Sequence, residues 1–307
     1  GLGNQFLDEL TAADVVLQVV DASGGTNAEG EPVEPGSRDP AADVDFVDEE
    51  LDAWLAGLVD DNWESVERKS RSPEFDLEAA LTAMLTGVGA TEPDVAAVLR
   101  DLAYPDDPKR WTGGDRDRLA RAIRTRTKPM VVVANKADAA SEATLERLRV
   151  GTDKPVVPAT ADGELALRRA VEAGVVAYDP GDDDFDVVGD VSDAQRTGLD
   201  AIREVMARLG GTGVQSALNA AVYDRLDRIT VYPVQDASRW TDGSGTMLPD
   251  AFLLPTGSTP RDLAYAVHTD IGDGYLHAVD ARSSRRIGED HELAEGDVVK
   301  IVSTAGP

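Results

Sequence analysis

Four consecutive residues, Asn-Lys-Ala-Asp at positions 135–138, have the right chemistry to recognise a purine base. They follow the apolar run 130–134, which is typical of a buried strand. The carboxylate of Asp138 can accept two hydrogen bonds, from N1–H and the exocyclic amine of guanine, and adenine has no such pair of donors on that edge. The amide of Asn135 can reach the acceptor side of guanine, and the stem of Lys136 can lie along the base and ribose. An analogue that lacks the donors would leave a carboxylate unpaired, at a cost of about 1–3 kcal/mol. The alternative for these four residues alone is a simple turn after a strand.

A second segment, Thr-Ala-Asp-Gly-Glu at positions 160–164, follows the next predicted strand, 156–158, and precedes a helical pattern. Thr160 and Ala161 are small, so the backbone there can approach a base closely. Glu164 is placed to cap the following helix. Alone this segment would be an ordinary loop and helix start. Together the two segments predict a guanine site at the ends of neighbouring strands.

Composition limits what kind of protein this is. The chain has 307 residues, enough for two or three domains, and its formal net charge is −28. An excess of acidic residues with few lysines is typical of proteins in high intracellular salt, where screening reduces self-repulsion. An acidic surface for a basic partner is the alternative, but the acids are spread along the whole chain. Without cysteine there is no disulfide, thiol nucleophile or thiolate metal site. No apolar run approaches the length of a membrane span, so we expect a soluble, cytoplasmic protein.

The phosphate-binding motif G-x-x-x-x-G-K-[ST] does not occur in the sequence. The glycine-rich runs 210–213 and 242–245 lack its lysine, and we interpret them as a helix break and a loop tip. The chain starts without methionine inside an amphipathic pattern formed by Leu2, Phe6 and Leu10. We therefore expect the phosphate loop and the magnesium ligands to lie upstream of Gly1, and we expect hydrolysis only in the intact protein.

Three segments near the start, 1–8 (Gly-Leu-Gly-Asn-Gln-Phe-Leu-Asp), 13–16 and 19–23, resemble the YchF/Obg-like GTPases, which are related to translation factors. The family order continues with a helical insertion, the N-K-A-D strand, the T-A-x-x-E loop and a C-terminal TGS domain. The resemblance implies that GTP binds with Mg²⁺, that a backbone N–H of the second loop meets the guanine carbonyl oxygen, and that the intact protein hydrolyses GTP. It also implies that the nucleotide state changes affinity for the ribosome, RNA or a translation factor. The alternatives are a binding scaffold without turnover and an ATP-preferring member. The nucleotide-binding residues expected on this basis are Asn135, Lys136, Asp138, Thr160 and Ala161; no catalytic or metal-binding residue is assigned.

The patterns predict an α/β fold with three parts. An incomplete, doubly wound parallel sheet of the P-loop NTPase type covers residues 1–40 and 128–228. Only helical patterns occur in the insertion, 41–127, where the residue types at 72–74 and 91–94 predict helix starts. Residues 229–307 change to a β pattern around one helix, which predicts a ubiquitin-like β-grasp module. Its segments 254–264 and 295–299 resemble the TGS domain, which is associated with RNA or ribosome contact.

Three sets of side chains have alternative interpretations. Three tryptophans of the insertion could form a docking surface, although helical spacing favours the core for the first: Trp54, Trp63 and Trp111. Three consecutive aspartates, 182–184, could bind a divalent ion or form a solvated loop. One basic cluster is a candidate RNA contact or a solvated hairpin: Arg282, Arg285 and Arg286. The three histidines, at 268, 277 and 291, do not match a metal-binding pattern.

Overall fold

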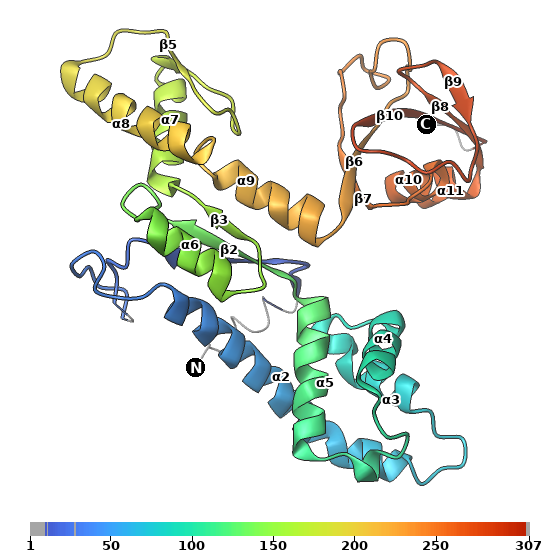
Figure 1. The fold of residues 1–307 in the computed structure, drawn as a ribbon. Coiled ribbons are helices and arrows are strands. Elements are labelled where there is room, and N and C mark those ends of the chain that lie inside the picture. The colour runs from blue at the N-terminus through green and yellow to red at the C-terminus, as the bar shows by residue number, and fades with distance from the viewer. Residues whose placement is uncertain (1–9, 11, 28, 305–307) are drawn as a thin grey trace. The chain divides into compact units, whose positions relative to one another are not determined.

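A computed structural model describes residues 10, 12–27 and 29–304, so the opening octapeptide of the resemblance lies outside the described residues. The chain forms two compact units, residues 1–221 and 222–307. We call them the first and the second unit. Figure 1 shows both units, with labels on most of their helices and strands.

The centre of the first unit is a parallel sheet of three strands in the order β1-β2-β3. These strands are β1 (Val16–Asp21), β2 (Met130–Asn135) and β3 (Val156–Pro158). Asp21 is paired in register with Asn135, so β1 and β2 end side by side. Because all three strands run in one direction, their carboxyl ends lie at one edge of the sheet.

Helices cover both faces of this sheet. On one face, Val132 and Ala134 pack with Leu145 of α6 (Glu142–Gly151) and Val44 of α2 (Ala41–Lys69). On the other face, Val131 and Val133 pack against α9 (Val214–Asn219) and the π-helical turn η3 (Ala220–Arg225). A strand buried on both faces has a continuous apolar sequence, as 130–134 does. The predicted doubly wound α/β fold is confirmed.

Residues 41–127 are helical, as predicted. After α2 come α3 (Leu77–Leu85), the 3₁₀ turn η1 (Thr86–Val88), α4 (Glu92–Leu102), the 3₁₀ turn η2 (Pro108–Arg110) and α5 (Gly113–Thr127). Thr91 caps α4 in a capping box with Asp94, as expected. The helix start predicted at 72–74 is wrong. Those residues form a turn, and α3 begins at Leu77 because the carboxylate of the extended residue Asp76 accepts the N–H of Ala79 at 3.1 Å.

The tryptophans of this helical part belong to its core. Trp63 and Trp111 are buried, and their ring centroids lie 4.9 Å apart. Trp111 also stacks on Tyr104 at 4.1 Å and donates its indole N–H to the Pro105 carbonyl at 2.7 Å. Trp54 is partly buried against the same cluster. A docking surface made of all three side chains is therefore wrong, because Trp63 and Trp111 are buried in the core.

The rest of the first unit follows β3. Helix α7 (Ala161–Glu172) leads to a short antiparallel pair, β4 (Val176–Ala177) and β5 (Asp186–Val187), and then to α8 (Asp193–Leu209). This two-stranded pair lies outside the three-stranded sheet. Asp184 of the acidic loop forms an ion pair with Arg203 at 2.8 Å. Within the described ranges, no group of three or more His, Asp or Glu side chains is arranged to hold a metal ion.

The second unit is a β-grasp module, the fold expected of a TGS domain. Its strands are β6 (Arg228–Pro233), β7 (Phe252–Pro255), β8 (Tyr275–Asp280), β9 (Arg285–Ile287) and β10 (Asp297–Ser303). They form a sheet in the order β7-β6-β10-β8-β9, in which β6 and β10 are parallel and the other neighbours antiparallel. Helix α10 (Pro260–Val267) begins after Thr259, whose side chain caps it, and packs Leu263 into the core; α11 (Thr269–Asp273) follows.

The predicted division into three domains stays a prediction. The sheet and the helical insertion lie in one compact unit, and the boundary to the second unit falls at residues 221 and 222. Among the described helices, none is both long and apolar enough to cross a membrane.

Candidate functional site

The carboxyl edge of the parallel sheet collects the residues predicted to recognise a base. The segment 135–138 leaves β2 there, and residues 159–161 leave β3 beside it. Two backbone hydrogen bonds join the two exits: Ala159 N–H donates to the Ala134 carbonyl at 2.9 Å, and Ala137 N–H donates to the Ala159 carbonyl at 3.0 Å. The carboxyl ends of parallel strands are where α/β folds of this kind bind ligands.

The Asn-Lys-Ala-Asp turn has a fixed backbone and two exposed side chains. Lys136 has a φ of +58°, a left-handed conformation that costs a non-glycine residue roughly 1–2 kcal/mol. Ala137 is fully buried, and its carbonyl accepts a hydrogen bond from the guanidinium of Arg208 at 2.8 Å. Lys136 and Asp138 on either side of it are exposed. The buried alanine therefore anchors a turn that presents its charged neighbours to solvent.

Asp138 has the properties that base recognition needs. It lies in the turn after β2, not in a helix, and it is exposed. Among the described residues, no hydrogen-bond donor or cation engages its carboxylate. Both oxygens are thus available to a ligand that brings two donors.

Lys136 is held by residues that the sequence did not indicate. Its ammonium donates to Asp21 Oδ2 at 2.7 Å and to Thr26 Oγ1 at 3.0 Å. Burial tends to raise the pKa of Asp21, but hydrogen bonds from Lys136, Ser23 and Thr26 outweigh it and lower the pKa to about 2. Asp21 is therefore ionised and fixes Lys136 along the edge of the sheet. The only sequence signal was an aspartate at the end of the neighbouring strand.

Asn135 ties the second loop to the first. Its Oδ1 accepts the N–H of Ala161 at 3.0 Å. That N–H is at the position where the resemblance expects a donor to the guanine carbonyl oxygen, so a bound base would share or replace this bond. Thr160 is buried, and its hydroxyl accepts the N–H of Gly163 at 3.4 Å as the N-cap of α7. The structure thus places Ala161 at the edge and Thr160 beneath it.

The expectation that Glu164 caps α7 is wrong. The cap is Thr160, and Glu164 lies one residue beyond the position from which a side chain reaches back to the cap. Instead its carboxylate is buried and accepts the hydroxyls of Thr212 at 2.6 Å and Tyr178 at 2.8 Å. Glu164 is therefore part of the support below the second loop.

The basic cluster lies in the second unit and is exposed. Arg282 donates to the Gly296 carbonyl at 2.8 Å, and its guanidinium lies over the Trp240 ring, 5.0 Å from the centroid. Arg285 and Arg286 lie on β9, an edge strand that pairs only with β8 in the described sheet. The cluster thus joins an aromatic face to two solvent-facing cations.

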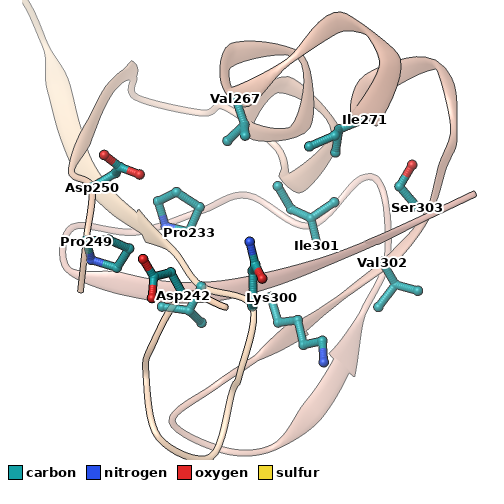
Figure 2. A pocket seen from close by; sticks show the side chains of 12 residues that line it. Pro233, Asp242, Pro249, Asp250, Val267, Ile271, Lys300, Ile301, Val302 and Ser303 are labelled. Atoms are coloured by element: carbon teal, nitrogen blue, oxygen red, sulfur yellow. The ribbon is translucent and has the colours of Figure 1, made fainter. Parts of the chain in front are cut away.

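The second unit also contains a cavity of about 420 Å³, lined by residues of β6, β10, α10, α11 and the loop after β6. Figure 2 shows Val267 and Ile271 above Pro233 and Ile301, with Asp242 and Asp250 to the side. None of the predicted base-recognition residues lines it. The cavity is thus separate from the proposed base chemistry.

Magnesium does not fit the described residues by themselves, because they contain no cluster of acidic ligands. The side chains at the sheet edge are instead of the types that can hydrogen-bond to a base.

Comparisons with known proteins agree with this architecture. Residues 133–236 match the family described as Obg-like GTPase YGR210-like, G4 motif-containing domain, and residues 245–303 match the TGS domain. An uncharacterized GTP-binding protein of Methanocaldococcus jannaschii is 42% identical over 309 residues, which cover 99% of this chain and 77% of that protein. The crystal structure of a GTP binding protein from Pyrococcus horikoshii superposes with a TM-score of 0.80 at 40% identity, covering 97% of this chain and 81% of that one.

A more distant structure, the YchF GTPase of Schizosaccharomyces pombe, shares the fold with a TM-score of 0.56 at 16% identity, covering 98% of this chain and 75% of that one. The resemblance drawn from the sequence is thereby confirmed. The chain belongs to the Obg-like GTPase family, in its YGR210-like branch, and carries a TGS domain.

Proposed function

We propose that the protein binds guanine nucleotides at the carboxyl edge of its parallel sheet. The observation that carries this proposal is the unpaired, exposed carboxylate of Asp138, held beside Asn135 on a turn with a buried anchor. The similar proteins from Methanocaldococcus and Pyrococcus are named as GTP-binding, which supports the same reading.

Each predicted residue has a role in this site. Asp138 accepts N1–H and the exocyclic amine of the base, and each bond to a charged acceptor contributes about 1.5–3 kcal/mol. Asn135 offers its amide N–H groups to the acceptor edge, and its Oδ1 holds Ala161. The stem of Lys136 lies along the base while its ammonium stays on Asp21. Thr160 fixes the loop from below through its cap.

Competition binding on the intact protein tests base recognition. GDP should displace a fluorescent guanine nucleotide far better than ADP. Asp138→Asn should weaken GDP binding by about 10- to 100-fold, from the loss of one charged hydrogen bond. It should at the same time favour the xanthine nucleotide, whose 2-oxo group accepts from the new amide. Asp153→Asn, at another exposed aspartate, is the matched control. Equal competition by ADP and GDP would refute the proposal.

Turnover is proposed for the intact protein, with Mg²⁺ bound to GTP. Phosphoryl transfer to water depends on positioning and charge stabilisation around the terminal phosphate, and we assign none of that machinery to the described residues. A scaffold that binds without hydrolysis and an ATP-preferring enzyme are the competing functions. Phosphate release measured with GTP and with ATP separates the three functions. Release only from GTP supports the GTPase, and release mainly from ATP supports the ATP-preferring enzyme. No release from either nucleotide supports the scaffold.

For the second unit we propose contact with RNA in the cytoplasm. This RNA is part of the ribosome or of another translation-associated partner. Arg282 stacked on Trp240 and the exposed Arg285 and Arg286 support this, because stacked guanidinium and aromatic faces suit unpaired bases. The double variant Arg285→Gln/Arg286→Gln should weaken binding of single-stranded RNA, and Arg261→Gln in α10 should not. Equal RNA or ribosome affinity with GDP and with a non-hydrolysable GTP analogue would refute coupling to the nucleotide.

The acidic composition supports a further proposal, that the protein is adapted to high salt. The free energy of unfolding should then increase with added KCl.

A further inference from the structure

We propose that Glu164 and Thr212 are positioning residues that aim the second base loop at atom 6 of the purine, an inference that rests on the proposed recognition of guanine. Neither side chain is placed to touch the base. Both lie below the loop, buried, and they act through the backbone of residues 160 and 161.

Glu164 is a buried carboxylate shared by three parts of the first unit. Its side chain is almost fully enclosed, with the residue 5% exposed. Its Oε2 accepts the hydroxyls of Thr212 at 2.6 Å and Tyr178 at 2.8 Å, and its Oε1 accepts Arg168 Nε at 2.6 Å. Burial tends to raise the pKa of Glu164, but the hydrogen bonds from Thr212, Tyr178 and Arg168 outweigh it, so the pKa lies below its ordinary value. The carboxylate therefore stays charged and holds its donors in fixed places.

Thr212 passes this constraint to the loop. It is 2% exposed, and while its hydroxyl donates to Glu164, its carbonyl accepts the N–H of Thr160 at 2.8 Å. The Thr160 carbonyl in turn accepts the N–H of Glu164 at 3.1 Å. The three residues thus form a closed ring of hydrogen bonds around the peptide groups next to Ala161. Because both backbone groups of Thr160 are fixed, the direction of the Ala161 N–H is fixed as well.

The ring of hydrogen bonds should act on recognition of the base carbonyl and not on recognition of the 2-amine. The Ala161 N–H lies on the side of Asn135, where the resemblance puts the guanine carbonyl, whereas Asp138 lies on the other loop. Loosening the ring should therefore weaken recognition of the base carbonyl and leave recognition of the 2-amine by Asp138 in place. A residue that served only overall stability would affect both equally.

Binding of three diphosphates to the intact protein tests the inference. GDP is the reference, the inosine nucleotide lacks the 2-amine, and the 6-thioguanine nucleotide changes only atom 6. Thr212→Val keeps the shape and the backbone carbonyl but removes the hydroxyl, and Glu164→Gln removes the charge. The control Glu172→Gln changes an exposed glutamate on the same helix, α7. Thermal melting of each variant checks the fold, and Tyr178→Phe provides a milder loss of one donor to the same oxygen.

Thr212→Val and Glu164→Gln should weaken GDP binding by about 5- to 30-fold, which is the effect of one misplaced hydrogen bond. The preference for GDP over the 6-thio nucleotide should shrink by a similar factor, with the preference over the inosine nucleotide unchanged. Tyr178→Phe should reduce the preference for GDP over the 6-thio nucleotide by a smaller factor. Glu172→Gln should change neither this preference nor the preference over the inosine nucleotide. A parallel loss of both preferences, or no loss in variants that still fold, overturns the inference alone. If the unmodified protein does not prefer GDP to ADP, the proposed function fails too.

Discussion

Two glycines in the turn between α8 and α9 allow the packing below the base loops to be tested. Gly213 has a φ of +82°, and a Cβ added there would lie 2.0 Å from the Pro158 carbonyl oxygen and 2.8 Å from Ala159 Cα. Gly210 has a nearly equal φ of +76°, and nothing lies within 4 Å of its added Cβ. Gly213→Ala and Gly210→Ala therefore share the cost of the left-handed conformation and differ in the clash.

The expected magnitudes follow from this geometry. Each alanine pays roughly 1–2 kcal/mol for its backbone conformation. At position 213 the contact with the carbonyl must also open from 2.0 Å to at least 3.0 Å, since shorter Cβ contacts are essentially never seen. A backbone shift of about 1 Å in closely packed surroundings requires large bond-angle changes, which cost about 4 kcal/mol for 15°. We expect Gly213→Ala to destabilise the sheet by about 5 kcal/mol, the sum of the two costs, and Gly210→Ala by about 1 kcal/mol.

Hydrogen exchange of the β2 and β3 amides is the suitable assay, because it reports the opening free energy of this sheet and not that of the second unit. GDP affinity should fall as well in Gly213→Ala, since Pro158 and Ala159 lead directly into the second base loop, and it should be nearly normal in Gly210→Ala. Equal effects of the two substitutions on exchange would refute the close approach of the turn to β3.

Two further predictions concern charge and core packing. The pKa of Asp21 is lowered from 3.8 to about 2. The contribution of Asp21 to the free energy of unfolding is therefore fully present above pH 3.8 and is lost as the pH falls from about 4 to about 2. Acid unfolding curves should show this loss, and they should no longer show it in Asp21→Asn. Trp111→Ala should destabilise the helical part by about 3–5 kcal/mol, because a buried indole that packs on Trp63 and Tyr104 is removed, whereas the half-buried Trp54→Ala should cost less in urea unfolding followed by circular dichroism.

Local patterns in the sequence predicted local structure well. The apolar run before Asn135 is the central buried strand, and the cap at Thr91 opens a helix as expected. These signals work because a strand buried on both faces and a capped helix start each need particular residues within a few positions. The error at residues 72–74 has the same origin: serine, proline and glutamate suit a turn as well as a helix start, and Asp76 is the better cap.

Support for the base loops could not be predicted, because it comes from distant residues. Arg208 holds the Ala137 carbonyl across 71 positions, and Thr212 meets Glu164 across 48. Neither pair has a sequence signature, and the glycines around Thr212 are equally typical of a helix break. Trp63 and Trp111 were ambiguous for the same reason, since only tertiary contact decides whether an indole lies in a core or on a surface.

The end of α8 and the turn after it, residues 208–213, also explain how two loops from different strands could serve the proposed base site. The groups of a recognition site must be held within about 0.5 Å of the positions that binding requires. Loops ordinarily position such groups less precisely than helices or strands do. Here Arg208 fixes the carbonyl of Ala137 on the first loop, and Thr212 fixes the N–H of Thr160 on the second. One short segment thus constrains both loops, and the hydrogen bond between Asn135 and Ala161 joins the loops to each other. Changes in this turn should therefore alter nucleotide selectivity without contact to the nucleotide, whereas changes at Asp138 should alter it through the base edge alone.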